Sequence, residues 1–547
     1  MSSIFTSSMS GMNAMQDLID GTIAKMNFPK PGSTYQPILE NNIDPFSFNP
    51  GINVTQVYDH YNDFITEEKQ QNYTKISEDQ THIDQLMKIE DLLDDKSDVF
   101  STKVNELYDQ IKEDIIVNHN TQINESIAQK LSNVTVEIKD FDKKLSFLEN
   151  DIKNCIQNYI AQADEIANKI SEINKHLESI PARDRTGKKN PILREREFLE
   201  TELQKLIGVK ITKSEKDYNI ALQNGQSLVH NSEHHNIYSI TNPKDPKYIS
   251  IGYKHNNTRT LVIDEIEPVI STGSLGALFK FKREELLNTR NKIGQLSINF
   301  IDSINSYHML GYDKDGRLGQ QIFKMDDPEV TSKQSSVPSQ LVSATWSSSS
   351  NAKASNYQVK FHHDEWTITR LLDNQIIQPT KFNQDNNFGS TSLSFDGITL
   401  NINGTSHEGD TYDIKPYAKT FEQLQVISDR NAPFAFSSTN DLNQINRNNA
   451  LIMQKLNEDP LVNQTETLHE SYNNFTKAIS YKRHTLENGL GFKEKIVDVL
   501  HDKQDAMSQD IEKDYQDLVQ EQKCYEANSK LFKIAEKILD DIITAYS

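Results

Sequence analysis

Apolar residues near the C-terminus recur at every seventh position, and this repeat restricts how the segment can fold. The repeat is formed by Ile511, Leu518, Tyr525, Phe532, Leu539 and Tyr546. Further apolar residues widen it into a stripe, namely Tyr515, Leu531, Ile534, Ile538 and Ile542. Such a repeat lines up side chains on one face of an α-helix, and this face requires a packing partner. The pattern predicts a helix from about Gln509 to Tyr546, roughly 55 Å long at about 1.5 Å per residue.

The N-terminus carries a second stripe of this kind. Its members are Phe5, Met9, Met12, Ile19, Ile23 and Met26, and Gln16 fills the remaining slot. The stretch NFPKPGSTYQP then ends the helix, because proline lacks an amide donor and disfavours helix before it. Isolated helices are marginal in water, so both ends are predicted to be partly disordered until something covers them. The alternative is that each helix lies on the core of its own domain.

Between the two ends, the sequence pattern alternates between helical and extended periods. Residues 51–206 are heavily charged and mostly helical in pattern, which is typical of an antiparallel bundle or rod. Alternation around Asn224 and Gly225 predicts a β-hairpin. The serine-rich segment 331–355 is predicted to be a flexible linker, and further short strands follow it. Helix returns from about Asp441.

Composition excludes several classes of function. The chain has 58 lysines and arginines against 79 aspartates and glutamates, and this net charge of −21 argues against a general affinity for nucleic acid or anionic lipid. Its two cysteines, Cys155 and Cys524, cannot build a disulfide framework or a cysteine zinc cluster. No stretch of about 20 apolar residues is present. The first residues also lack the features of an ordinary secretory signal, so export would use another route.

A glycine-marked turn, TGSLGALFKFK, precedes a long helical pattern over residues 275–305. It lacks both the phosphate-binding loop pattern and the dinucleotide-binding pattern, so nucleotide binding is not predicted. Gly273 and Gly276 instead indicate a turn and a close approach of two backbones. The helix behind them has its own apolar seam, formed by Leu286, Ile293, Leu296, Phe300 and Ile304.

Two polar clusters are the remaining candidate sites. GYDKDGRLGQQI places Asp313, Asp315 and Gly316 as in a calcium loop, but Gly311 and Ile322 occupy two positions that need strong ligands, so a polar turn is predicted. FHHDEW groups His362, His363, Asp364 and Glu365, which predicts a hairpin tip, with a weak surface metal site as the alternative. No nucleophile or zinc-protease motif is present. The sequence therefore predicts no enzyme activity, no cofactor and no essential metal.

Taken together, these segments resemble the family of flagellar hook-associated protein 1, flagellar axial proteins that join the hook to the filament. The most specific stretch is TGSLGALFKFKREELLNTRNKIGQLSINFIDSINSYHMLGYDKDG, which is similar to the family's turn, long helix and pattern of Asn, His, Gly, Asp and Gly. Other similar segments are GINVTQVYDHYNDFITEEKQQN, LREREFLETELQKLIGV, IALQNGQSLV, NRNNALIMQKL and IEKDYQDLVQEQKCYEANSKLFKIAEKILDDIITAY. The likeness spans nearly the whole chain.

The resemblance implies a structural protein that is secreted unfolded through the flagellar type III export route and assembles at the hook tip. Implied partners are the hook protein, the second hook-associated junction protein, an export chaperone and the export apparatus, and the implied homo-oligomer is a ring of about eleven subunits. No nucleic acid and no membrane insertion are implied. The stripe residues of both ends become candidate contacts with neighbouring subunits and the chaperone. Alternatives are another axial protein, either flagellin-like or the second junction protein, and an intracellular coiled-coil scaffold.

The implied fold is an α+β multidomain chain. Its N- and C-terminal helices form a coiled coil, and β-rich domains are inserted into a long α-helical rod domain. The predicted divisions are a terminal helical domain of 1–50 with 505–547, a rod of 51–206 with 273–325 and 425–504, a small β domain of 207–272, and an outer β domain of 333–424.

Overall fold

The structure is a computed structural model that describes residues 2–27, 35–42, 51–59, 63–93, 100–116, 121–180, 189–214, 217–241, 249–254, 261–263, 270–324, 326–334, 341–383, 391–427, 433–441, 447–505 and 511–546. The chain divides into two compact units. Unit 1 comprises Met1–Ile83, Ile152–Lys280 and Thr485–Ser547, and unit 2 comprises Asp84–Asp151 and Phe281–His484. Among the helices of the described ranges, none is long and apolar enough to cross a membrane.

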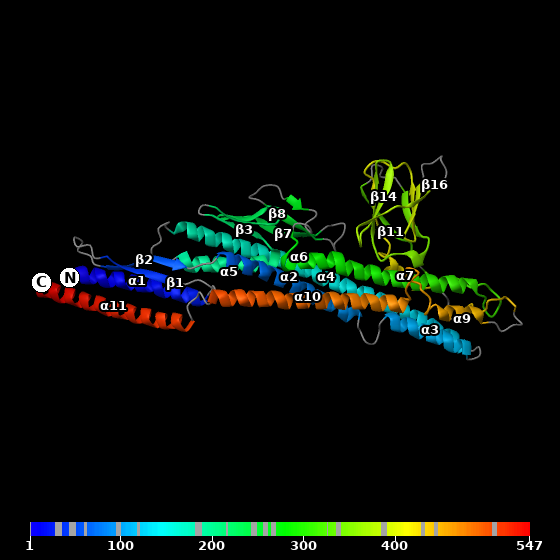
Figure 1. Cartoon of the computed structure of the whole chain (residues 1–547), viewed down its shortest axis with the longest axis horizontal. Helices are drawn as coiled ribbons and strands as arrows, with labels where there is room; N and C mark the ends of the chain where they lie inside the picture. The colour runs from blue at the N-terminus through cyan, green and yellow to red at the C-terminus, as the bar shows by residue number, and fades with distance from the viewer. Residues whose placement is uncertain are drawn as a thin grey trace. The chain divides into compact units, whose positions relative to one another are not determined.

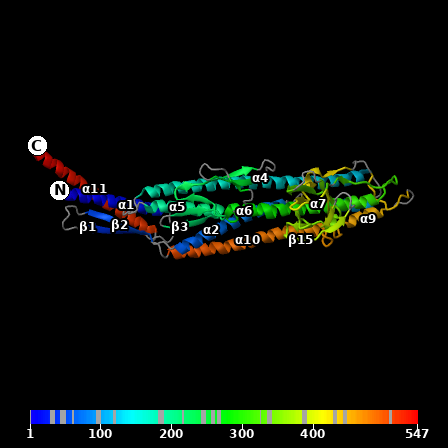
Figure 2. The same ribbon diagram turned by 90° about the horizontal axis from the view of Figure 1, so that it is seen from above.

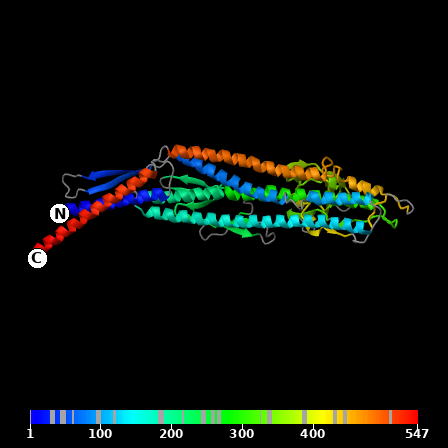
Figure 3. The same cartoon turned by 90° about the horizontal axis from the view of Figure 1, so that it is seen from below.

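The two ends of the chain lie side by side in unit 1 (Figure 1). Both predicted helices are confirmed, as α1 (Ser2–Asn27) and α11 (Ile511–Tyr546). They run antiparallel, since Gly11 lies against Asn528 while the Thr22 hydroxyl donates to the Glu521 carboxylate at 3.2 Å. Figure 2 and Figure 3 show the same pairing, with both termini at one end of it. The α1 helix ends where the proline-rich stretch begins.

A β-hairpin follows α1, although the sequence predicted helix from Gly51 onward. Its strands are β1 (Tyr35–Asn42) and β2 (Gly51–Asp59), which pair antiparallel. The β2 segment is rich in β-branched residues, which fit a pleated strand, and its partner strand lies outside the segment that suggested a helix. The helix α2 (Asp63–Leu93) begins only after β2, so the predicted helical start at Gly51 is wrong.

The helical body of unit 1 consists of α5 (Lys189–Ile207), the greater part of α6 (Gly273–Phe281), and parts of α2, α4 (Thr121–Ser179) and α10 (Leu468–Asp505). The α2 and α6 helices meet where the Thr81 hydroxyl donates to Ser274 Oγ at 2.9 Å. Lys493 of α10 forms an ion pair with Asp79 of α2. These contacts join segments that lie far apart in the sequence.

Two small antiparallel sheets lie on these helices. One is formed by β3 (Lys210–Lys213), β4 (Tyr218–Ala221), β5 (Ser227–His230) and β6 (Glu233–His234), and the other by β7 (Asn236–Thr241), β8 (Ile249–Lys254) and β9 (Leu261–Ile263). The predicted hairpin is confirmed, with Gly225 at φ +87° in the turn between β4 and β5. Asp164 of α4 fixes the sheets to the helix, because its carboxylate accepts from His234 Nε2 at 3.0 Å and from the Ile237 N–H at 2.8 Å.

Unit 2 is built around the part of the helix predicted over residues 275–305 that follows Lys280. This helical stretch runs through α6, a π-helical turn η1 (Lys282–Leu286) and α7 (Leu287–Leu310). Its predicted seam is confirmed, because Leu286, Ile293, Leu296, Phe300 and Ile304 are all buried. Arg290 of α7 reaches α4, with Nη1 2.9 Å from Asp142 Oδ1. Among the described residues, the other α-helices that lie wholly in this unit are α3 (Phe100–Ile116), α8 (Thr420–Gln423) and α9 (Asn448–Lys455).

A β-sandwich forms the second part of unit 2. Its first sheet has the order β11-β19-β13-β14-β15 and its second the order β12-β18-β17-β16. The strands are β11 (Glu329–Gln334), β12 (Leu341–Trp346), β13 (Tyr357–His362), β14 (Glu365–Arg370), β15 (Gln375–Ile377), β16 (Thr380–Asn383), β17 (Thr391–Phe395), β18 (Ile398–Asn403) and β19 (Thr411–Lys415). One core, which includes Trp366, Tyr412 and Leu400, joins the two sheets. The short strands β10 (Phe323–Lys324) and β20 (Gln425–Val426) pair with each other.

The predicted flexible linker at 331–355 is wrong for its described residues. β11 and β12 occupy this segment together with the short 3-10 helix η2 (Ser349–Asn351). β11 pairs with β19 and β12 pairs with β18. Long-range pairing of this kind overrides the local preference of serine-rich sequence for irregular structure.

Candidate assembly interface

The buried face of α1 is lined by small and apolar side chains. Its members follow a three-four spacing, namely Ser8, Gly11, Met15, Leu18 and Thr22. Ala14, Met15 and Leu18 form a small core against which Tyr525 of α11 packs. A Cβ at Gly11 would lie 2.7 Å from Asn528 Oδ1, so glycine allows the two helices to approach closely.

The predicted contact residues of α1 divide between two faces. Ile19 is buried within the chain and Met12 is half-buried, whereas Met9 and Ile23 are exposed. The side chains of Phe5 and Met26 lie outside the described residues. Small polar residues thus form part of the inner face, and part of the predicted apolar stripe points outward.

Three of the predicted contact residues of α11 have described side chains, and these lie on the side of the helix that packs on α1. Leu518, Tyr525 and Phe532 are half-buried, and Glu521 and Asn528 on the same side contact α1. The side chains of Ile511, Leu539 and Tyr546 lie outside the described residues. The prediction that each end needs a packing partner is therefore met in part within the chain, because the two ends cover each other.

A second apolar face of α11 stays open to solvent. Leu531, Ile534 and Ile538 are 49%, 55% and 42% exposed. Their spacing of three and four residues places them on one side of the helix. Apolar residues that gather on one exposed side mark an interaction surface more strongly than single exposed ones do.

The glycine turn before α6 is a structural feature. Gly273 has a φ of +73°, and a Cβ there would lie 2.8 Å from the Lys205 carbonyl oxygen. A Cβ at Gly276 would lie 2.5 Å from the backbone carbon of Ser271. The predicted turn with close backbone approach is confirmed.

Both polar clusters are turns. Asp313 Oδ1 accepts from the backbone N–H groups of Asp315 at 2.8 Å and Arg317 at 2.9 Å. His363 and Asp364, at φ +51° and +60°, form the two-residue tip between β13 and β14. Within the described ranges, no group of three or more His, Cys, Asp or Glu side chains is arranged to hold a metal ion.

The structure of the loop after α7 shows what the residues of the pattern Asn, His, Gly, Asp and Gly do in the stretch that ends in GYDKDG. Buried Asn305 accepts at Oδ1 from the N–H groups of Ile322 and Phe323, both at 2.9 Å, and its Nδ2 donates to the Phe323 carbonyl at 2.9 Å. Gly316 has a φ of +74°, which favours glycine. The pattern therefore folds the chain back onto its own helix.

His308 joins this loop to the segment that returns from the sandwich. The backbone N–H of Ala435 donates to His308 Nε2 at 3.0 Å. His308 Nδ1 lies 2.6 Å from the Gln320 carbonyl oxygen, so this nitrogen carries the proton. Burial lowers the pKa of His308, while the Gln320 carbonyl and Asp313 act in the opposite direction.

Acidification is expected to destabilise unit 2 through His308. Its pKa lies below the unfolded value of 6.5, so its contribution to stability is fully present above that pH and is lost as the pH falls toward the folded pKa. One such group changes the free energy of unfolding by at most about 1.4 kcal/mol per pH unit. Tryptophan fluorescence during urea unfolding measures this, because both tryptophans of the chain, Trp346 and Trp366, lie in unit 2. The variant His308→Gln should show a shallower pH dependence, and an equal dependence would contradict the assignment.

Comparison with known proteins gives matches along the chain. Residues 86–323 match the flagellar hook-associated protein FlgK helical domain, and residues 331–416 match the flagellar hook-associated protein 1, D2-like domain. Flagellar hook-associated protein 1 of Buchnera aphidicola subsp. Schizaphis graminum is 41% identical over 549 residues, which covers 100% of both chains. That of Escherichia coli K12 is 24% identical and covers 99% of this chain and 100% of its own. The flagellar hook junction protein FlgK from Burkholderia pseudomallei has a similar fold, with a TM-score of 0.69 at 14% identity, covering 80% of this chain and 99% of that one.

A chain that matches flagellar hook-associated relatives over its full length is a structural protein of the flagellum and not an enzyme. The chain belongs to the flagellar hook-associated protein 1 family. It is a component of the hook–filament junction, and its partners lie in the hook and the filament.

Proposed function

We propose that the chain assembles into the junction through the apolar faces of its two terminal helices. The observation that carries this proposal is the open face of α11, where Leu531, Ile534 and Ile538 are exposed although an adjacent face of the same helix packs on α1. Met9 and Ile23 supply a matching exposed pair on α1. Burying one such aliphatic side chain contributes about 1.5–3 kcal/mol, so several of them in each subunit contact favour stable assembly.

The predicted contact set for neighbouring subunits and an export chaperone belongs to this proposal. It comprises Phe5, Met9, Met12, Ile19, Ile23 and Met26 on α1, and Ile511, Leu518, Tyr525, Phe532, Leu539 and Tyr546 on α11. Family membership supports it, as does the apolar character of both helices. Residues that face each other within the chain become contacts between subunits if the two helices rearrange into a coiled coil on assembly.

Family membership also supports the finer points of the proposal. These are a ring of about eleven copies, export unfolded through the flagellar type III route, direct contact with the hook protein and the second junction protein, and the division into terminal, rod, small β and outer β domains given above. The proposed location of the chain is the secreted, extracellular part of the flagellum.

Binding to isolated hook fragments tests the proposal. The purified full-length chain, carrying a gold label, is mixed with hook fragments and examined by negative-stain electron microscopy. We expect label at one end of each fragment, and we expect excess unlabelled chain to displace it. Label spread along the sides of the fragments, or no bound label, would show that the chain does not assemble at the hook tip.

A further inference from the structure

A cavity of about 370 Å³ lies in unit 2, where the β-sandwich meets α7 and the segment that leads into α10. Its charged lining consists of Lys292, Lys353, Arg370 and Glu466. Neutral amide and hydroxyl side chains supply further polar lining, namely those of Asn288, Gln295, Asn463, Ser471 and Asn474. The walls therefore carry an excess of positive charge in a chain whose net charge is −21.

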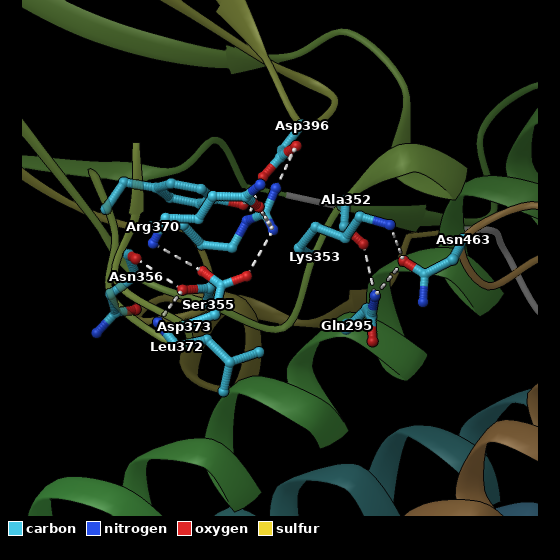
Figure 4. Close-up of polar contacts among 12 residues, drawn as sticks. Gln295, Ala352, Lys353, Ser355, Asn356, Arg370, Leu372, Asp373, Asp396 and Asn463 are labelled. Carbon is cyan, nitrogen blue, oxygen red and sulfur yellow. Dashed lines mark hydrogen bonds and ion pairs between the residues drawn. The ribbon is translucent and has the colours of Figure 1, made fainter. Parts of the chain in front are cut away.

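Arg370 is already neutralised by carboxylates outside the cavity lining (Figure 4). Its Nε donates to Asp396 Oδ2 at 2.8 Å and its Nη2 to Asp396 Oδ1 at 3.2 Å. Its Nη1 donates to Asp373 Oδ2 at 2.9 Å. A guanidinium paired in this bidentate way has little capacity for another anion. Lys292 and Lys353 are therefore the cationic side chains of the lining that can still bind an anion.

Lys353 forms no ion pair with any carboxylate in the described ranges. Its Nζ donates to Asn463 Oδ1 at 3.0 Å, and the same oxygen accepts from Gln295 Nε2 at 3.4 Å (Figure 4). Asn463 is held in a tight turn at φ +54°, which is uncommon for a residue other than glycine. A neutral amide oxygen offsets only part of a full positive charge, so Lys353 presents a cation at a fixed position.

Lys292 approaches the cavity from α7. Its Nζ donates to Ser471 Oγ at 2.8 Å and to Gln295 Oε1 at 3.1 Å. Burial lowers the pKa of Lys292, and nearby Lys353 lowers it further, while Glu466 acts in the opposite direction. Hydrogen bonds from Ser471 and Asn474 in turn hold the pKa of Glu466 below its ordinary value. Two ammonium groups therefore share this space with one carboxylate.

We propose that this cavity binds a small divalent oxyanion, of the phosphate or sulfate class, between Lys292 and Lys353. Two ammonium groups, each with an N–H left over from the hydrogen bonds named above, and the amide of Asn288 in the lining supply the hydrogen-bond donors that such an anion accepts. The anion lies against the two ammonium groups, which only the Glu466 carboxylate opposes in the lining. Because Lys353 follows η2 of the sandwich side and Lys292 belongs to α7, the bound anion also links these two parts of unit 2.

Isothermal titration of inorganic sulfate into the full-length chain tests the proposal, with ionic strength held constant by chloride. We expect one saturable site, with an affinity at least about tenfold weaker in Lys353→Gln. The matched control is Lys360→Gln, which changes an exposed lysine on β13 and should bind sulfate as the parent does. Lys292→Gln should also weaken sulfate binding, because Lys292 is the second lysine proposed to contact the anion.

Thermal unfolding separates a loss of sulfate binding from a loss of stability in a variant. Sulfate should raise the unfolding midpoint of the parent and of Lys360→Gln by more than that of Lys353→Gln, each compared with its own value in chloride. Absence of saturable binding to the parent would overturn the proposal. An equal affinity and an equal rise of the midpoint in Lys353→Gln would overturn it as well.

Discussion

Replacing Gly311 by alanine is expected to destabilise unit 2 by about 3 kcal/mol, the upper part of the range for overpacking a filled site. The added Cβ would lie 2.0 Å from the Ala435 carbonyl oxygen and 2.2 Å from Asn449 Nδ2. Neither atom is free to move away. Asn449 Nδ2 donates to this same carbonyl at 2.6 Å and to the Tyr307 carbonyl at 3.0 Å, and the Ala435 N–H donates to His308.

The penalty at Gly311 comes from contact and not from backbone conformation. Its φ of −92° and ψ of 172° are extended values that any residue adopts. Gly409 provides the matched control in the same unit, because no atom lies within 4 Å of a Cβ there but its φ is +89°. Gly409→Ala should therefore cost only the strain of a left-handed alanine, about 1–2 kcal/mol.

Urea unfolding followed by tryptophan fluorescence compares the two variants, since Trp346 and Trp366 both report on unit 2. We expect the free energy of unfolding to fall more in Gly311→Ala than in Gly409→Ala. Equal losses would mean that the return segment around Ala435 shifts easily, and that the loop after α7 does not fix it.

Features set by local sequence could be predicted. The helix from Ile511 to Tyr546 follows from a seven-residue spacing that needs no knowledge of the partner. The hairpin at Gly225 and the tip at His363 and Asp364 follow from turn residues placed between alternating strands. The buried seam of α7 follows from the helical period alone.

Features set by distant residues could not be predicted. β12 forms within serine-rich sequence because β18, more than 50 residues later, pairs with it. In the sequence, His308 is only one residue of the pattern of Asn, His, Gly, Asp and Gly. Its role is to accept a hydrogen bond from the backbone N–H of Ala435, which lies 127 residues away in the sequence. No periodicity identifies such a pair, since the contact exists only once the chain has returned from the sandwich.

The candidate interface could be predicted from the sequence only in part. Spacing located the apolar helices at both ends, and on α11 the predicted residues with described side chains lie on the side that packs on α1, but on α1 the spacing did not identify the inner side. Gly11 and Thr22 lie on the inner face of α1 because close helix approach and a hydrogen bond to Glu521 favour them there. An apolar count ignores both residues, so the exposed position of Ile23 emerged only from the structure.

An aspartate at position 534 is expected to block assembly while leaving the isolated chain as stable as the parent. Ile534 is 55% exposed, so Ile534→Asp should change the free energy of unfolding by no more than about 0.5 kcal/mol. In the proposed junction the same side chain is covered by a neighbouring subunit. The variant then loses about 1.5–3 kcal/mol of apolar burial, and an unpaired carboxylate must also leave water.

These two effects together predict that binding to hook ends weakens at least about 100-fold, since each 1.4 kcal/mol is a factor of ten. Gln522→Asp is the matched control, because it introduces the same residue and the same charge at an exposed position on the polar flank of α11. Labelled-chain binding to hook fragments gives the affinities, and circular dichroism during thermal unfolding confirms that both variants are folded. If Gln522→Asp and Ile534→Asp bind hook ends equally well, the face formed by Leu531, Ile534 and Ile538 is not a subunit contact. If Ile534→Asp instead unfolds at a lower temperature than the parent, this face is covered within the isolated chain, and the assembly proposal loses the observation that carries it.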